Sequence, residues 1–219
     1  ADRHPGELSI LATGSLTNLR GAYERDRYFF EKVKEIVLMG GITSPLVFDK
    51  KVMNELNFSC DPPATRTVLT KGRNVSIMTG NNCLKVLFTK QEYRERFSGK
   101  ENRAAAYIME KTDYWFGYND EDYGIPGFYN WDVTAAAYLM HPELFEDDVK
   151  CLRVSEQDLE TGYLGMDGDG MRDGAAAGKK GERCTCNLPV IREPEAFKDN
   201  IYETWLSVPG IRTGVCRQN

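Results

Sequence analysis

Two polar side chains, Glu55 and Asn57, are the first candidates for chemistry in this sequence. They lie in the stretch VMNELNFSCDPP, where they alternate with the apolar residues Leu56 and Phe58. In an extended segment, residues two apart point to the same side, so the carboxylate and the amide would face one way and the apolar pair the other. Such a pair could bind a polyhydroxylated ligand through hydrogen bonds to its hydroxyls. A solvated loop charge followed by a turn residue would show the same spacing, so both interpretations stay open.

Asp132 is a second candidate because it stands at the expected start of a helix. Residues 131–145, WDVTAAAYLMHPELF, have helical spacing, with small alanines that allow close packing. An Asp in the first helical turn often serves only to cap the helix and complement its dipole. Trp131 beside it is more often a core residue than a platform for stacking. The residues alone therefore leave ligand binding and helix capping both open for Asp132.

Three short apolar runs that end in glycine predict the strands that position these residues. Continuous apolar runs suit strands buried on both faces of a parallel sheet, and the segments between them have helical spacing. Asp61 before Pro62 is typical of a helix start. The pattern predicts an α/β fold with a mostly parallel sheet, whose ligands bind at the carboxyl ends of the strands. The three runs are residues 8–14, 35–41 and 74–80.

The remaining sequence predicts further helices, a C-terminal β-hairpin and a closing helix. Residues 149–165 and 181–191 alternate like strands around a long turn, and residues 193–208 have helical spacing. The turn contains DGDGMRDG, Asp167 to Gly174, which is similar to a calcium loop but lacks the bidentate Glu, so a flexible turn is expected. No repeat or linker divides the chain, and we expect residues 1–219 to form a single domain.

Composition excludes several classes of function. The 219 residues are 41% hydrophobic and 28% charged, with a net charge of -5 and no long basic run, which argues against a nucleic-acid partner. No apolar run approaches the roughly 20 residues of a membrane span, so we expect no membrane partner and a cytoplasmic location. Six cysteines and two histidines show no zinc spacing, and we expect reduced, buried thiols.

Four segments, in order, resemble the inosine-uridine-type nucleoside hydrolases. They are HPGELSILATGSLTNL, EIVLMGG, ELNFSCDPPAT and NWDVTAAAYLMHPELF, and together they span residues 5–145. The resemblance implies a nucleoside-hydrolase-like fold and cleavage of the N-glycosidic bond of a ribonucleoside. It also implies a calcium ion that binds the attacking water and the ribose diol, and a homo-oligomer. Calcium suits this chemistry because a hard cation takes oxygen ligands.

The same resemblance implies a role for each candidate residue. Thr13 would give its backbone carbonyl to the calcium ion, and Asp132 would supply a carboxylate ligand and touch the ribose. Glu55 and Asn57 would hold the ribose hydroxyls. Met39 would line the same sugar site.

Three departures from the family pattern modify these expectations. Asp49 stands where the family usually has Asn, which exchanges an amide for an acceptor-only carboxylate. Trp131 stands where many members have His, as in the purine-preferring members whose tryptophans stack on the base. The family's aspartate cluster, D-x-D-x-x-x-D-D, does not occur in this sequence, and we expect it to lie N-terminal to Ala1.

The missing cluster supplies most of the family's metal ligands and its general base. We therefore expect this chain alone to be a poor catalyst, and to associate with the missing N-terminal segment or with further copies of itself. The alternative is a non-catalytic relative of the family that binds a nucleoside or a sugar.

Overall fold

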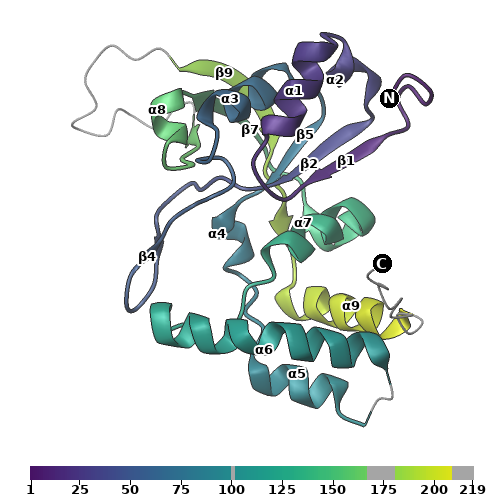
Figure 1. The fold of residues 1–219 in the computed structure, drawn as a ribbon, viewed down its shortest axis with the longest axis vertical. Coiled ribbons are helices and arrows are strands. Elements are labelled where there is room, and N and C mark those ends of the chain that lie inside the picture. Colours follow the sequence, from purple (N-terminus) through teal and green to yellow (C-terminus); the bar gives the residue numbers. More distant parts are fainter. Residues whose placement is uncertain (100–101, 167–180, 209–219) are drawn as a thin grey trace, which may run out of the picture. The chain divides into compact units, whose positions relative to one another are not determined.

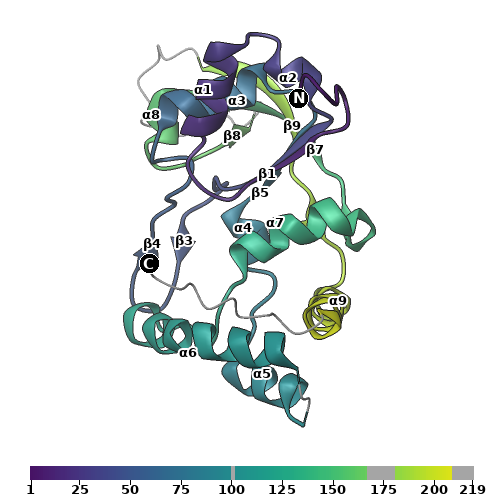
Figure 2. The same cartoon turned by 45° about the vertical axis from the view of Figure 1, so that its right-hand side comes forward.

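The computed structural model describes residues 1–99, 102–166 and 181–208, and it contains two compact units (Figures 1 and 2). Within the described ranges, the sheet unit comprises residues 1–47, 52–85, 130–166 and 181–192, and the helical unit comprises residues 48–51, 86–99, 102–129 and 193–208. The number of domains stays a prediction.

A six-stranded sheet forms the centre of the sheet unit. Its order is β1-β2-β5-β9-β7-β8, and the neighbours from β1 to β9 are parallel, whereas β7 is antiparallel to both β9 and β8. This confirms the expected α/β fold with a mostly parallel sheet. The strands are β1 Ser9–Ala12, β2 Glu35–Met39, β5 Val75–Met78, β7 Val149–Val154, β8 Gly165–Met166 and β9 Glu182–Asn187. Two further pairs are β3 Leu46–Val47 with β4 Val52–Met53, and β6 Phe145–Glu146 with β10 Val190–Ile191.

Burial explains why two of the three apolar runs became central strands, β2 and β5. β1, at the edge of the described sheet, has no buried residue, so the expectation of burial on both faces is wrong for it. The last four residues of β2 are all buried, as expected for a central strand covered on both faces. In Figures 1 and 2, α1 and α3 lie on one side of the sheet and α7 on the other. The helices of this unit are α1 Thr17–Arg25, α2 Phe29–Lys32, α3 Pro62–Lys71, α4 Gly80–Cys83, α7 Trp131–Met140 and α8 Glu156–Leu159, with a 3₁₀ turn at Pro142–Leu144.

The predicted helix start at Asp61 is confirmed. The Asp61 carboxylate accepts a hydrogen bond from the backbone N–H of Ala64 at 3.0 Å, and Pro62 opens α3. A second carboxylate oxygen of Asp61 accepts from the Thr17 hydroxyl at 2.7 Å, which joins the starts of α1 and α3.

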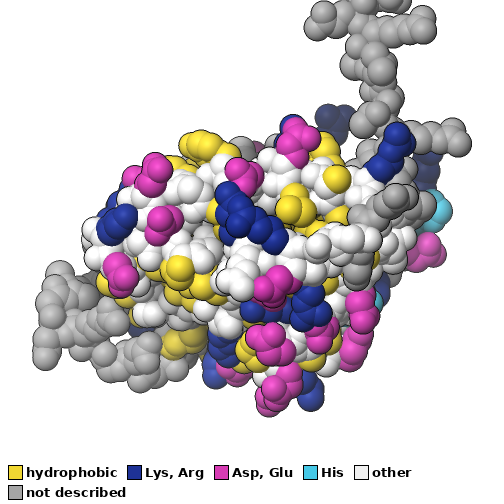
Figure 3. Space-filling view, turned by 90° about the horizontal axis from the view of Figure 1, so that it is seen from below, with side chains coloured by type: hydrophobic (Ala, Val, Ile, Leu, Met, Phe, Trp, Pro, Cys, Tyr) yellow, Lys and Arg dark blue, Asp and Glu magenta, His cyan; other side chains and the backbone are white. Residues whose placement is uncertain are grey.

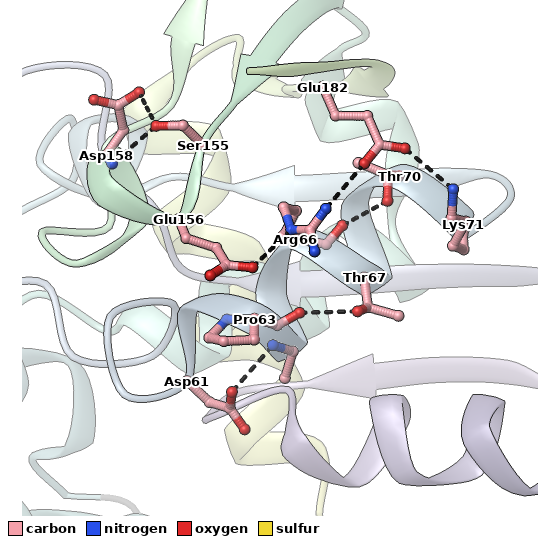
Figure 4. Close-up of polar contacts among 11 residues, drawn as sticks. Asp61, Pro63, Arg66, Thr67, Thr70, Lys71, Ser155, Glu156, Asp158 and Glu182 are labelled. Carbon is pink, nitrogen blue, oxygen red and sulfur yellow. Dashed lines mark hydrogen bonds and ion pairs between the residues drawn. The ribbon is translucent and has the colours of Figure 1, made fainter. Parts of the chain in front are cut away.

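Charged side chains connect α3 to α8 and β9 on the surface of the sheet unit (Figure 4). Arg66 contacts Glu156 at 2.9 Å and Glu182 at 3.2 Å, and Lys71 contacts Glu182 at 3.1 Å. Ser155 begins α8 by accepting from the N–H of Asp158 at 3.1 Å. Exposed pairs of this kind add little stability singly; one of the three links α3 to α8 and the other two link α3 to β9.

The helical unit contains α5 Lys90–Phe97, α6 Arg103–Tyr123 and α9 Pro194–Ser207. Its core is aromatic, and the buried ring of Tyr93 makes edge-to-face contacts at centroid distances of 5.2 to 6.1 Å with Phe88, Phe97, Phe116, Tyr202 and Trp205. On the face drawn in Figure 3, acidic and basic side chains are interspersed rather than separated by sign.

The C-terminal predictions are confirmed in part. β7 and β9 pair as antiparallel strands and α9 closes the described chain, but α8 and β8 lie between the two strands. The helix predicted over residues 131–145 ends at Met140. Pro142 disfavours helical backbone at the residue before it, His141, and so stops the helix there. The calcium-like loop from Asp167 to Gly174 lies outside the described residues.

The cysteines differ from expectation in their burial. Of the cysteines in the described residues, Cys83 and Cys186 are buried, Cys184 is partly buried, and Cys60 and Cys151 are exposed, so the expectation of buried thiols is wrong for Cys60 and Cys151. Both stand where their side chains face solvent: Cys60 in the turn before α3, and Cys151 on the outer face of β7. In the described ranges, no helix combines the length and apolar character that a membrane span requires.

Candidate functional site

The carboxyl ends of the parallel strands meet at one edge of the sheet, and several predicted residues follow them. In the strand register, Ala12 pairs with Leu38 and Met39 with Met78, so Thr13 directly follows β1 at the level where β2 and β5 end. Thr13 is exposed. It thus lies at the edge where ligands bind in α/β sheets.

The start of α7 reaches the same edge. α4 begins two residues after β5, and the thiol of its last residue, Cys83, donates to the backbone carbonyl of Trp131 at 4.0 Å. Burial, with a smaller contribution from the nearby charge of Asp132, raises the pKa of the Cys83 thiol to about 12. These contacts place Asp132, the second residue of α7, beside the end of β5.

Glu55 sits in a cradle of backbone N–H groups. Its Oε1 accepts from Gly41 at 3.2 Å and from Asn57 and Phe58 at 2.9 Å each. Its Oε2 accepts from Phe58 at 3.1 Å and Ser59 at 2.9 Å. Hydrogen bonds to an ionised acceptor are the stronger kind, so the carboxylate holds the chain around itself in a fixed turn.

This turn corrects the expected extended segment. Residues 57–60 form a turn, Phe58 is fully buried and Leu56 is 67% exposed, so the two apolar residues do not share a face. The physical reason is the Glu55 carboxylate, which bonds to the N–H groups of the residues after it and winds the chain back. Local carboxylate-to-backbone bonds compete with extended structure in this way.

Asn57 is oriented by Met39. Its Nδ2 donates to the backbone carbonyl of Met39 at 2.9 Å and lies 3.1 Å from the Met39 Sδ. Within the described ranges its Oδ1 accepts no hydrogen bond, which leaves it available to a ligand hydroxyl. The structure therefore brings Met39, Glu55 and Asn57 into one cluster at the end of β2.

Asp132 has the opposite surroundings. It is exposed overall, and its carboxylate makes no hydrogen bond or ion pair with the described part of the chain. Partial burial of the carboxyl group raises the pKa of Asp132 above its ordinary value. The residue does not cap α7, because the N-cap position belongs to Asn130. A carboxylate that is partly desolvated and has no protein partner is suited to an external ligand.

The two remaining candidates stay predictions. Trp131 is half-buried and opens α7. Asp49 is exposed and belongs to the helical unit. Neither position tests the proposed contact with a base or a sugar.

The described residues do not complete a calcium site. No three of the His, Cys, Asp and Glu side chains in the described ranges are grouped so that they could hold a metal ion. The Thr13 carbonyl and the Asp132 carboxylate offer oxygen ligands of the right chemistry, but calcium takes about 6 to 8 of them. This part of the chain therefore fits calcium as a contributor of ligands and not as a whole site.

Sequence reasoning missed Gly41 and Ser59 as partners of Glu55. A signal was available, because an acidic residue followed by residues that can turn often accepts their N–H groups. The alternation of polar and apolar residues obscured it by favouring an extended segment.

Fold and site together define an α/β protein with polar side chains grouped at the carboxyl edge of a parallel sheet, the edge where ligands bind in such folds. The family model described as inosine-uridine preferring nucleoside hydrolase matches residues 1–198, and the chain belongs to this family.

Named relatives agree with the family. The chain is 33% identical over 169 residues to probable uridine nucleosidase 1 of Oryza sativa subsp. japonica, which covers 74% of this chain and 50% of the relative. It is 30% identical over 142 residues to the pyrimidine-specific ribonucleoside hydrolase RihA of Salmonella newport, over 64% of this chain and 45% of the relative. The chain thus spans about half the length of the curated relatives it matches.

Solved structures support the fold. A plant nucleoside hydrolase superposes with a TM-score of 0.78 at 22% identity, over 95% of this chain and 64% of the other. The purine-preferring ribonucleoside hydrolase from Gardnerella vaginalis superposes with a TM-score of 0.74 at 20% identity, over 94% and 62%.

Proposed function

We propose that this chain binds the ribose of a ribonucleoside and takes part in hydrolysis of its N-glycosidic bond. The observation that supports this most is the orientation of Asn57, whose amide nitrogen is fixed on Met39 while its oxygen accepts nothing from the described chain. Such an acceptor is held ready for a hydroxyl without the cost of ordering it on binding. Membership of the nucleoside hydrolase family supplies the reaction.

In this proposal the reaction adds water across the bond between the anomeric carbon and the base. The carbon–nitrogen bond breaks and a carbon–oxygen bond to water forms, with an oxocarbenium-like sugar in the transition state. The water gives up a proton and the leaving nitrogen gains one. The chain's own residues bind and orient the sugar, with the Asn57 oxygen and the Asp132 carboxylate accepting from ribose hydroxyls. Holding the sugar in a reactive orientation accounts for a large part of such rate gains.

Glu55 acts in the same proposal mainly through the turn it holds. Both of its oxygens accept from backbone N–H groups, so its remaining capacity for a ribose hydroxyl is small. Its charge-assisted bonds keep Asn57 where the sugar is expected.

We also propose calcium dependence, on the family resemblance. Thr13 and Asp132 would contribute two oxygen ligands, and the remaining ligands would come from outside the described residues. Bound calcium would supply positive charge to which the ribose diol can coordinate. Calcium titration, monitored by the melting temperature of the wild type and of Asp132→Asn, tests this part: a calcium response equal in both proteins would refute the role of Asp132.

Preference for purine nucleosides is the finer part of the proposal. Trp131 presents an aromatic side chain at the start of α7, and stacking favours the larger purine ring. The names of the relatives support uridine instead. Comparing kcat/KM for inosine and uridine decides between the two, and a higher value for uridine would overturn the purine preference.

The central experiment measures ribose release from inosine and uridine by the full chain with and without added calcium. Asn57→Ala should lower kcat/KM about tenfold or more, the equivalent of one to two lost hydrogen bonds. The matched control is Asn18→Ala, which removes an exposed amide from α1. Absence of hydrolysis and of any ribose-induced change in melting temperature in the wild type would refute the proposal.

A non-catalytic binding protein is the second candidate. It is favoured by the lack of a three-ligand metal group in the described ranges and by Asp49 at a position where the family usually has Asn. This candidate predicts ribose-induced stabilisation without ribose release. Either form of the proposal includes a homo-oligomer, which light scattering of the purified chain tests.

A further inference from the structure

We infer that Gly162 is a positioning residue for the ribose site, because the Glu55 carboxylate occupies the space that any side chain at this position would need. The inference rests on the proposed function. It adds a residue far from the Glu55 turn in the sequence, in the connection between α8 and β8.

Gly162 lies in a turn that is bonded directly to the end of β2. Its backbone φ is +71°, a left-handed conformation that side chains other than glycine's disfavour. Its carbonyl accepts from the N–H of Ile42 at 2.8 Å, and the N–H of Leu164 donates to the Ile42 carbonyl at 2.8 Å. Ile42 follows Gly41, whose N–H donates to Glu55. The turn and the Glu55 cradle therefore share one short segment of backbone.

A methyl group at Gly162 would collide with the carboxylate itself. An ideal Cβ there would lie 2.2 Å from Oε2 of Glu55 and 2.6 Å from its Cδ and Cγ. These distances are far shorter than van der Waals contact, so one of the two groups must move.

Moving either group would cost free energy, because each is held by hydrogen bonds. If the carboxylate moved, the N–H groups of Gly41, Asn57, Phe58 and Ser59 would lose an ionised acceptor. If the turn moved, it would strain the hydrogen bonds that the N–H groups of Gly162 and Tyr163 donate to carbonyls of α8 at 3.0 Å each. The easier outcome is displacement of the carboxylate, since the turn is also bonded to Ile42 on its other side.

The expected consequence is a displaced Asn57. The N–H of Asn57 is one of the groups that Glu55 holds, and its side chain must reach the Met39 carbonyl at the same time. Loosening the turn therefore changes the position of the amide oxygen proposed to accept from ribose. A displacement of about 1 Å at such a group can lower the rate by about 100-fold.

Gly162→Ala in the full chain tests this, with Gly6→Ala as the matched control. Gly6 has a φ of +75°, and nothing lies within 4 Å of a Cβ built there, so the control reproduces the backbone strain without the collision. We expect Gly162→Ala to speed amide hydrogen exchange at Asn57, Phe58 and Ser59, to abolish the ribose-induced rise in melting temperature, and to lower kcat/KM for inosine by up to about 100-fold. Gly6→Ala should change none of these.

A second comparison separates positioning from general loss of stability. In a Glu55→Ala background the collision is absent, so adding Gly162→Ala should lower the melting temperature no more than Gly6→Ala lowers that of the wild type. This holds even if Gly162→Ala alone does not fold. Equal losses from Gly162→Ala in both backgrounds would overturn the inference.

The outcomes distinguish the inference from the proposed function. If the wild type responds to ribose and Gly162→Ala responds equally, the inference fails and the proposed function stands. If the wild type neither responds to ribose nor releases it from inosine or uridine, the proposed function fails, and with it the role of Gly162 in a ribose site. Amide exchange then still reports whether Gly162 holds the Glu55 turn.

Discussion

Glu55 and Asp132 are both carboxylates near the carboxyl edge of the sheet, yet their surroundings are opposite. Glu55 accepts five hydrogen bonds from four backbone N–H groups. Asp132 accepts none from the described chain, and partial burial raises its pKa. The same chemical group thus organises the backbone in one place and has no partner within the described residues in the other.

This difference predicts where each charge contributes free energy. Bonds between an ionised acceptor and backbone donors stabilise the folded chain, so Glu55 contributes to folding before any ligand arrives. A partly desolvated carboxylate without a partner costs free energy until a cation or a hydroxyl binds it. Substitution of Glu55 should therefore affect stability first, and substitution of Asp132 should affect ligand binding first.

The largest expected effect is the loss of stability in Glu55→Ala. Removing the acceptor leaves four N–H groups to water or to no partner, and we expect the free energy of unfolding to fall by about 3 kcal/mol. Urea denaturation followed by circular dichroism measures it. Glu55→Gln keeps one acceptor oxygen and should lose about half as much. A loss below about 1 kcal/mol in Glu55→Ala would show that the cradle is not what holds the turn.

The elements of the fold were predictable where one local pattern dominated. The strands β1, β2 and β5 lie within the three apolar runs, and Asp61 begins α3 as its type and its following proline indicated. Apolar runs predict strands well because a central strand must be buried on both faces. The short α8 was not predicted, since four residues carry too little periodicity to distinguish a helical turn from a strand.

The site was predictable in its residue types and not in their contacts. Glu55 and Asn57 could be selected because polar residues follow a predicted strand, and the structure places Asn57 against Met39 and Glu55 against Gly41, just after β2. Their alternation gave the wrong backbone shape, because spacing carries no information on which N–H groups a carboxylate will accept. The part played by Gly162 depends on a contact between residues more than 100 positions apart, which no local pattern contains.

Asp132→Asn should show the reverse of Glu55→Ala. The substitution removes a charge with no protein partner, so the free energy of unfolding should change by less than about 1 kcal/mol. Loss of the favourable interaction with the helix dipole lowers stability, and relief of the desolvation of the charge raises it, so the two effects oppose each other. Ribose-induced stabilisation should nevertheless disappear. Asp120→Asn, in an exposed part of α6, is the control. A large loss of stability in Asp132→Asn would mean that its charge serves the fold.

The contribution of Asp132 to stability should depend on pH, and this smaller effect also tests the difference between Asp132 and Glu55. Its pKa in the folded chain lies above the ordinary value of 3.8, so between the two values the folded state holds a proton that the unfolded state has released. The contribution of Asp132 to stability therefore falls as pH rises through this window, while binding that needs the ionised group increases. The difference in melting temperature between wild type and Asp132→Asn, measured from pH 3 to pH 7, isolates this group. A difference that does not vary with pH would contradict the raised pKa.

Asp49→Asn should give the smallest effect. It tests whether a third carboxylate stabilises the fold, as Glu55 is expected to, or contacts the ligand, as is proposed for Asp132. Asp49 is exposed, so we expect the substitution to leave the free energy of unfolding within about 0.5 kcal/mol of the wild type. Restoring the amide that the family usually has at this position restores a donor as well as an acceptor. If this residue contacts the sugar, KM for inosine should fall by about two- to tenfold, the value of one neutral hydrogen bond, with little change in kcat. Glu143→Gln, an exposed charge-to-amide change elsewhere in the chain, should leave KM unchanged, and an equal response in both variants would assign Asp49 to the solvated surface.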